Sequence, residues 1–252
     1  MITIKSPQEL AQMREAGRIV AEALALVESL LQPGVSTLEL DSRVEDLIRS
    51  RGGVPAFKGY RGFPGSICAS VNEEVVHGIP SDRVLVEGDV VKIDIGVKKG
   101  AFFGDSARSF GVGAISPDAE RLIRVCEGAL TAGLSEARPG QRLRDVSSAI
   151  GNFAANGGFA VVEDFVGHGI GRELHEQPQI PNFYRSNNKA DYDLVLREGM
   201  TLAIEPMINL GSHHVDTLSD GWTVVTRDRK LSAHFEHTVA VTARGPEVLT
   251  AL

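Results

Sequence analysis

The stretch "DVVKIDIGVKKGAFFGDSARSF" (residues 89–110) consists of two apolar, β-rich segments on either side of "KKG". This pattern is typical of a β-hairpin. A two-residue turn at Lys99–Gly100 would place Asp94 directly opposite Asp105, with their Cβ atoms about 5 Å apart. Two facing carboxylates in an apolar sheet repel each other unless a cation or a shared proton compensates. A solvated hairpin face is the alternative, but the neighbouring isoleucines and phenylalanines argue against full exposure.

Helical segments flank this hairpin in an order that occurs twice. Upstream, Ser6 and Glu9 form a predicted capping box for a helix that ends near the "PG" at 33–34, and a second helix follows. Downstream, a similar helix begins at Ser116, and again "PG" and a second helix follow it. Because these landmarks recur at a nearly constant offset, we interpret the chain as two related halves with a site between them. The predicted domain is residues 1–252, and its halves are roughly residues 1–115 and 116–252.

Composition limits the class of protein. The chain has 252 residues, 42% hydrophobic and 23% charged, as expected for a globular protein with a full core. Its net charge is -7 without a long basic run, which argues against nucleic acid as the primary partner. Only two cysteines occur, Cys68 and Cys126, which fits a reducing compartment. Neither a signal peptide nor an apolar run of roughly 20 residues is present, so we expect a cytoplasmic protein without membrane association.

Two further carboxylates accompany apolar runs in the second half. Glu205 follows such a run in "MTLAIEPMINL" (200–210), and Glu236 precedes one in "HFEHTVAVT" (234–242). A carboxylate at the boundary of an apolar strand is costly without a partner. The glycine-rich stretch "GHGIGRELHEQPQ" (167–179) adds two histidines.

These carboxylates and one histidine would form an oxygen-rich, nitrogen-poor metal site from both halves. Such a ligand set suits manganese, iron, cobalt or zinc and is too acidic for a structural zinc. Four carboxylates carry more charge than one divalent ion needs. We therefore expect two divalent ions about 3.5–4 Å apart, bridged by two carboxylates and a water. The carboxylates are Asp94, Asp105, Glu205 and Glu236.

At this point the sequence resembles the type I methionine aminopeptidases, which have the pita-bread metallopeptidase fold. The resemblance spans nearly the whole chain, and its motifs agree in order and spacing. It implies an α+β fold with two pseudo-symmetric halves and a curved antiparallel sheet flanked by helices, around two metal ions. The motifs are "GYRGFPGSICASVNEEVVHGIP" (59–80), "IDIGVKKGAFFGDSARSF" (93–110), "GHGIGRELHEQPQ", "GMTLAIEPM" (199–207) and "SDGWTVVTRDRKLSAHFEHTVAVT" (219–242).

The resemblance also implies a role for each site residue. Asp94 would bind one ion, and His168 and Glu205 would bind the other. The remaining carboxylates, Asp105 and Glu236, would bridge both ions. Glu205 would in addition be the proton shuttle. The catalytic residues His77 and His175 would not bind metal but would hold the substrate backbone and stabilise the oxyanion.

By the same resemblance, an apolar pocket holds the methionine side chain. Its residues would be Tyr60, Phe63, Cys68, Leu174 and Trp222, with Cys68 as a wall and not a nucleophile. The implied activity is removal of the initiator methionine when a small residue follows. The implied partners are N-terminal Met peptides and nascent chains, with the ribosome as a candidate contact and the monomer as the expected state.

The chain departs from the family pattern at several positions. Leu174 replaces a usual phenylalanine and could instead belong to the core. Arg61 replaces a usual histidine, and Gly96 a frequent threonine, so a hydroxyl near the metal ligands would be missing. His234 stands where glutamine is common. The stretch 180–199 is longer than usual and is expected to form a mobile loop near the cleft.

Three other functions remain open from the sequence. The first is an Xaa-Pro-type peptidase of the same fold, although such enzymes usually carry an N-terminal domain ahead of the first helix expected here. The second is a non-catalytic peptide-binding protein on this scaffold, although such proteins lose metal ligands and all five are present here. A hydrolase of other peptides is the weakest option.

Overall fold

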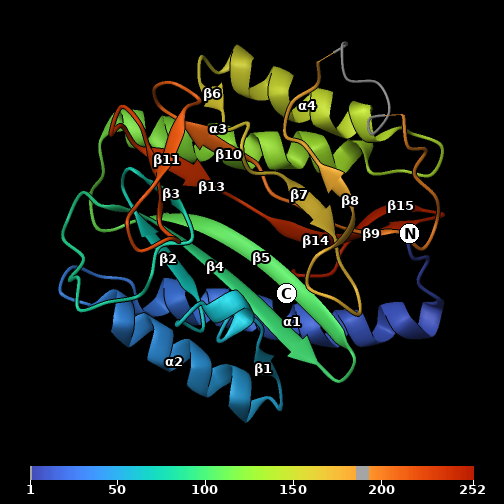
Figure 1. Cartoon of the computed structure of the whole chain (residues 1–252), viewed down its shortest axis with the longest axis horizontal. Coiled ribbons are helices and arrows are strands. Elements are labelled where there is room, and N and C mark those ends of the chain that lie inside the picture. The colour runs from blue at the N-terminus through green and yellow to red at the C-terminus, as the bar shows by residue number, and fades with distance from the viewer. Residues whose placement is uncertain (1, 186–192) are drawn as a thin grey trace.

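The computed structural model describes residues 2–185 and 193–252. Two pairs of helices enclose the strands, with α1 and α2 on one side and α3 and α4 on the other (Figure 1). The helices are α1 (Pro7–Leu30), α2 (Thr37–Ser50), α3 (Pro117–Glu136) and α4 (Leu143–Asn156), with a short 3-10 helix η1 (Tyr60–Gly62). The strands are β1 (Val54–Pro55), β2 (Cys68–Val71), β3 (Glu74–Val76), β4 (Val90–Lys99), β5 (Phe102–Gly111), β6 (Ala160–Val161), β7 (Gly167–Gly169), β8 (Glu176–Ile180), β9 (Thr201–Ile204), β10 (Met207–Asn209), β11 (Val215–Thr217), β12 (Val224–Thr226), β13 (Ser232–His234), β14 (His237–Thr242) and β15 (Gly245–Val248).

The predicted helix starts are confirmed. Ser6 caps α1, accepting a hydrogen bond from the backbone N–H of Glu9, whose carboxylate accepts one from the Ser6 N–H. Ser36 and Ser116 cap α2 and α3 in the same way with their side-chain oxygens. Each cap satisfies a backbone donor that the first helical turn leaves unpaired.

Each helix pair covers its own apolar core. One core lies between α1, α2 and the strands β2, β4 and β5, and contains Val20, Leu40 and Ile93. The second lies between α3, α4 and the strands β9, β13 and β14, and contains Leu122, Ile150 and Val239. All strand pairs among the described residues are antiparallel. Helices outside and antiparallel strands between them confirm the predicted α+β class.

The β4–β5 hairpin is present, but its predicted register is wrong by two residues. Lys99 pairs with Phe102, so the turn residues are Gly100 and Ala101. Glycine takes the first turn position at φ 59°, which a lysine there would adopt only with strain. Asp94 therefore lies opposite Ala107 and not opposite Asp105. Since strand side chains alternate with period two, the shift keeps both aspartates on one face as diagonal neighbours.

A seam between β5 and β14 joins the two halves of the strand layer. The hydroxyl of Thr238 donates to the carbonyl of Asp105 at 2.8 Å and accepts from the N–H of Asp105 at 3.0 Å. The Glu236 N–H donates to the carbonyl of Ala107 at 2.8 Å. These bonds fix two carboxylate-bearing residues from opposite halves beside each other.

Two expectations about the chain as a whole have different outcomes. In the part of the chain that the structure covers, no helix combines the length and hydropathy needed to cross a membrane. The stretch 180–199, expected to be a mobile loop, falls partly outside the described residues because 186–192 are not among them.

Helix α1 approaches β5 and the C-terminal segment very closely at Gly17. A Cβ atom at Gly17 would lie 2.1 Å from the Leu249 carbonyl oxygen. Replacing a helical glycine with alanine ordinarily stabilises a helix by about 1 kcal/mol. Here we expect Gly17→Ala to lower the free energy of unfolding by roughly 1–3 kcal/mol, because the clash is with backbone. Denaturant unfolding measures this, with Gln12→Ala on the exposed face of α1 as the control. Stabilisation by both variants would contradict the close approach.

Candidate active site

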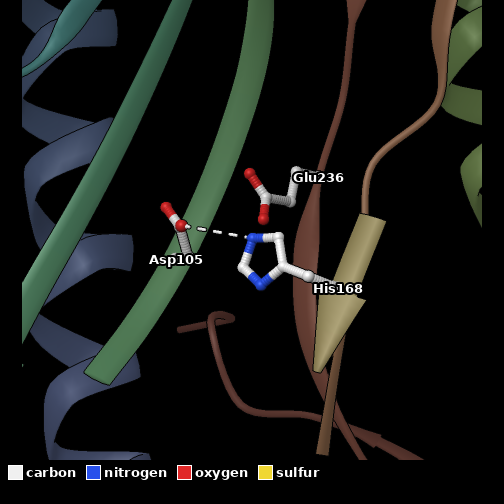
Figure 2. A group of neighbouring side chains, drawn as sticks. All are labelled: Asp105, His168 and Glu236. Carbon is white, nitrogen blue, oxygen red and sulfur yellow. Dashed lines mark ion pairs between the residues drawn. The ribbon is translucent and has the colours of Figure 1, made fainter. Parts of the chain in front are cut away.

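Antiparallel strands from both halves bring the predicted metal ligands to one place. Asp94 lies on β4 and Asp105 on β5, while His168 lies on β7. Glu205 directly follows β9, and Glu236 lies between β13 and β14. Figure 2 shows that Asp105, His168 and Glu236 point toward one another from three different strands or their ends.

Distances within this cluster fit a shared metal ion better than direct hydrogen bonds. His168 Nε2 is 3.6 Å from Glu205 Oε1 and 4.0 Å from Asp105 Oδ2. Both separations exceed the about 3.2 Å limit of a good N–H···O hydrogen bond. Two ligand atoms that each lie about 2.1 Å from one ion are roughly 3.4–3.8 Å apart. The donors of Asp105, His168 and Glu236 lie within 4.8 Å of one another, so these residues could hold an ion.

The carboxylates of the cluster are withdrawn from water. Burial raises the pKa of Asp94 to about 7 and that of Glu205 to about 8. Burial, followed by repulsion from the neighbouring carboxylates, raises the pKa values of Asp105 and Glu236 well above their ordinary values. Within the described residues, Asp94 Oδ1, Asp105 Oδ1 and Glu236 Oε1 have no hydrogen-bond partner. Buried oxygens without donors are costly unless a cation supplies what hydrogen bonds do not.

His168 is suited to bind metal as a neutral imidazole. Burial lowers its pKa to about 3, so the ring is uncharged near neutral pH. Its Nδ1 lies 2.9 Å from the Gly169 carbonyl oxygen. A proton on Nδ1 would satisfy that carbonyl and leave the lone pair of Nε2 facing the carboxylates.

Two other histidines border the same pocket without joining the metal cluster. His77 follows β3 at φ 60°, and burial lowers its pKa to about 4. His175 precedes β8, and its Nδ1 lies 3.0 Å from the Tyr60 hydroxyl. Burial also lowers the pKa of His175. Both are therefore neutral near pH 7 and can donate hydrogen bonds to a ligand in the pocket.

A single pocket contains all the residues predicted for the site. Aromatic and sulfur-bearing side chains form its apolar part; the Phe63 and Trp222 rings meet edge to face at 5.1 Å. Burial raises the pKa of the Cys68 thiol well above its usual value, which suits a pocket wall and not a nucleophile. Leu174, 2% exposed, lines the pocket and also packs in the apolar cluster behind it. The lining residues are Phe57, Tyr60, Arg61, Phe63, Cys68, His77, Asp94, Asp105, His168, Leu174, His175, Glu205, Trp222 and Glu236.

Phe57 is the pocket residue that the sequence did not reveal. Its ring occupies the space beside Gly96, where a Cβ atom would lie 2.5 Å from Phe57 Cε1. The missing side chain at Gly96 therefore does not leave a void, because an aromatic ring from another segment fills it. A glycine two positions after a predicted ligand was the only sequence signal of this contact.

Two other departures from the family pattern also lie at the site. Arg61 is exposed at the pocket mouth, with its guanidinium carbon 5.3 Å from the centre of the Tyr60 ring. His234, 1% exposed, lies on β13 with its Nε2 3.7 Å from Glu205 Oε2.

Comparison with known proteins agrees with this geometry. Residues 11–243 match the pattern of metallopeptidase family M24. The chain is 53% identical over 250 residues to methionine aminopeptidase 1 of Bacillus subtilis, covering 99% of each chain. It matches the crystal structure of methionine aminopeptidase from Thermotoga maritima with a TM-score of 0.96 and 43% identity over 100% of each chain.

A more distant comparison concerns the fold alone. The prolidase from Pyrococcus furiosus matches with a TM-score of 0.79 and 23% identity, over 99% of this chain and 65% of that one. Together these similarities confirm the expected pita-bread fold.

The raised carboxyl pKa values predict how the metal-free protein responds to pH. The buried histidines, whose pKa values are lowered to about 3–4 by burial, act in the opposite direction near pH 6.5. Their contribution fades toward pH 8, because an unfolded imidazole loses its proton around pH 6.5. The folded state keeps protons on Asp94 and Glu205 up to about pH 7 and 8, whereas unfolded carboxyls release them near pH 4. The folded state thus binds more protons, and its stability falls as pH rises from about 6.5 to 8. Lys92, whose pKa burial lowers to about 7, acts in the opposite direction but is one group against four.

Thermal unfolding of chelator-treated protein between pH 6.5 and 8 measures this effect. We expect the melting temperature to fall with pH, and saturating divalent ion to raise it most at the alkaline end. A melting temperature that stays constant or rises over this range without metal would contradict the clustering of desolvated carboxylates.

Proposed function

This chain belongs to metallopeptidase family M24, and we propose that its cluster of carboxylates and imidazole holds two divalent metal ions for removal of N-terminal methionine. It is a methionine aminopeptidase: relatives that carry this name are 45% to 53% identical over 99% of the chain. An Xaa-Pro specificity is not favoured, because the prolidase likeness is limited to the fold. The observation that carries the proposed mechanism is the convergence of four desolvated carboxylates and one neutral histidine at the floor of an apolar pocket.

We assign the ligands as the sequence resemblance implied. Asp94 would hold one ion, and His168 and Glu205 would hold the other. Asp105 and Glu236 would hold both, and their position at the seam between β5 and β14 supports this assignment. Two ions are proposed because four carboxylates exceed the charge that one divalent ion neutralises. Manganese, iron, cobalt and zinc all suit these ligands.

The residues of this chain bind and orient the peptide. When bound, the divalent ions would supply a water that is nucleophilic at neutral pH and would polarise the scissile carbonyl. Glu205 would act as the proton shuttle, holding at its carboxylate a proton that is destined for the departing amine. His77 and His175, neutral at pH 7, donate hydrogen bonds to the substrate backbone and to the oxyanion. The hydrogen-bonding contact between Tyr60 and His175 holds the imidazole in place.

The pocket next to the cluster fits a methionine side chain. Tyr60, Phe63, Cys68 and Trp222 provide apolar and polarizable walls, which suit a thioether. Leu174 and Phe57 complete the wall nearest the core. N-terminal Met peptides are thus the substrates. The preference for a small second residue is proposed from the sequence resemblance.

Several expectations from the sequence remain proposals. Nascent chains as the cellular substrate, contact with the ribosome, a monomeric state and a cytoplasmic location belong to this group. So does the division of one catalytic domain into halves at about residue 115.

Hydrolysis of short peptides tests the function directly. Protein reloaded with Co²⁺ or Mn²⁺ is expected to release methionine from a Met-Ala peptide and to leave an Ala-Pro peptide intact. Chelator-treated protein is the control and is expected to release neither residue. Preferential cleavage of the Ala-Pro peptide would refute the assignment.

Asp105→Asn tests the shared ligand. A neutral amide bridges two cations poorly, so we expect fewer or weaker metal sites in titration calorimetry together with lost activity. His175→Ala is the matched comparison, because it should lower kcat by about 10²–10³ through loss of one oxyanion donor while metal content stays intact. Two tight metal sites in Asp105→Asn would refute its assignment as the shared ligand. Loss of metal in His175→Ala would show that His175 is itself a metal ligand.

Leu174→Phe tests the pocket wall. A contact between sulfur and an aromatic ring is worth about 0.3–1.5 kcal/mol, so the variant should favour methionine over norleucine by a few-fold to about tenfold in kcat/KM. Metal content should not change. Because Leu174 is also packed against the core, the larger ring could lower stability by roughly 1–3 kcal/mol. A lower melting temperature with an unchanged methionine-to-norleucine ratio would show that the residue acts in the core alone.

A further inference from the structure

His234 is a buried imidazole with one nitrogen aimed at the metal cluster. It is 1% exposed, and Nε2 has no hydrogen-bond partner among the residues that the structure describes. Its backbone is held on both sides by Ser109, whose hydroxyl accepts from the His234 N–H at 2.9 Å and donates to its carbonyl at 2.8 Å. A fixed, buried nitrogen without a partner is costly unless something fills the space in front of it.

Glu205 lies between two imidazoles. Its Oε1 is 3.6 Å from His168 Nε2, and its Oε2 is 3.7 Å from His234 Nε2. Both separations are too long for a hydrogen bond and match two ligands about 2.1 Å from one ion. The spacing that makes His168 a candidate ligand therefore applies equally to His234, on the other oxygen of the same carboxylate.

Glu236 provides a third ligand next to Glu205 and His234. The donor atoms of Glu205, His234 and Glu236 all lie within 4.8 Å of one another. Glu236 is 2% exposed and its Oε1 also has no partner in the described part of the chain. This group of three shares Glu236 with the group of Asp105, His168 and Glu236 but uses a different imidazole.

We infer that Glu205, His234 and Glu236 form an additional divalent-cation position beside the proposed dinuclear centre. One imidazole and two carboxylates suit Zn²⁺ or Co²⁺ better than Mg²⁺, which prefers oxygen ligands and water. The position binds more weakly than the first two, because two divalent ions already neutralise the four carboxylates. The inference depends on these three residues and not on the peptide that the enzyme cleaves.

The zinc content of the protein tests this position. Wild-type protein and His234→Gln are dialysed to equilibrium against increasing Zn²⁺, and bound zinc is measured by atomic absorption. We expect His234→Gln to lose the weakest equivalent and to keep the tighter ones. Equal zinc content of the two proteins at every concentration would overturn the proposal.

A surface histidine pair provides the matched control. The rings of His213 and His214 lie 4.0 Å apart outside the pocket and could also bind zinc weakly. A double His213→Gln/His214→Gln variant should keep the equivalent that His234→Gln loses. Loss of that equivalent in the double variant and not in His234→Gln would also overturn the proposal.

A measurement on wild-type protein covers the case in which His234→Gln does not fold. Anomalous scattering at the zinc edge from zinc-soaked crystals should give a peak about 2.0–2.1 Å from His234 Nε2. Absence of this peak beside occupied positions at Asp105 and His168 would refute the additional position. The same preparation is also assayed for release of methionine from the Met-Ala peptide. Activity without the zinc peak would contradict this inference alone and leave the proposed function intact.

Discussion

Repulsion among four carboxyl groups in one desolvated place is the constraint on which the site depends. Asp94, Asp105, Glu205 and Glu236 are all held away from bulk water, and their pKa values are raised in consequence. Such a cluster must retain protons or bind cations, since neither the neighbouring histidines nor the apolar pocket wall supplies positive charge near neutral pH. The cluster therefore destabilises the metal-free fold, and the same repulsion favours the binding of divalent ions.

The seam between β5 and β14 keeps the repelling groups in place. Thr238 bonds both backbone groups of Asp105, and Glu236 is tied to the neighbouring Ala107. These hydrogen bonds use the backbone groups of Asp105 and Glu236. Their carboxylates therefore stay free to bind a cation, while the two strands are held together. The apolar cores on either side anchor the same strands to the two helix pairs.

Local interactions and the convergence of the carboxylates were predictable from the sequence, whereas strand register and packing contacts between distant segments were not. The capping box of Ser6 and Glu9 depends on residues three positions apart, whereas the α+β class came from the family resemblance. The predicted hairpin register was wrong because the sequence is compatible with a turn at Lys99–Gly100 or at Gly100–Ala101. The left-handed conformation of Gly100 at the first turn position decides between them. The contact of Phe57 with Gly96 joins segments that the sequence separates. Spacing alone could not distinguish the roles of His168 and His175; the family resemblance assigned them, and the geometry supports that assignment.

The ligands of the cluster are divided between distant stretches of chain. Asp94 and Asp105 come from the β4–β5 hairpin, whereas His168 lies on β7, and Glu205 and Glu236 lie at the ends of later strands in the second half. Neither stretch alone contains a complete coordination sphere, so chelation of metal becomes a reporter of correct assembly. A polypeptide cut between β5 and α3 would regain tight metal affinity only after its two fragments reassociate, which makes this scaffold a candidate for fragment complementation.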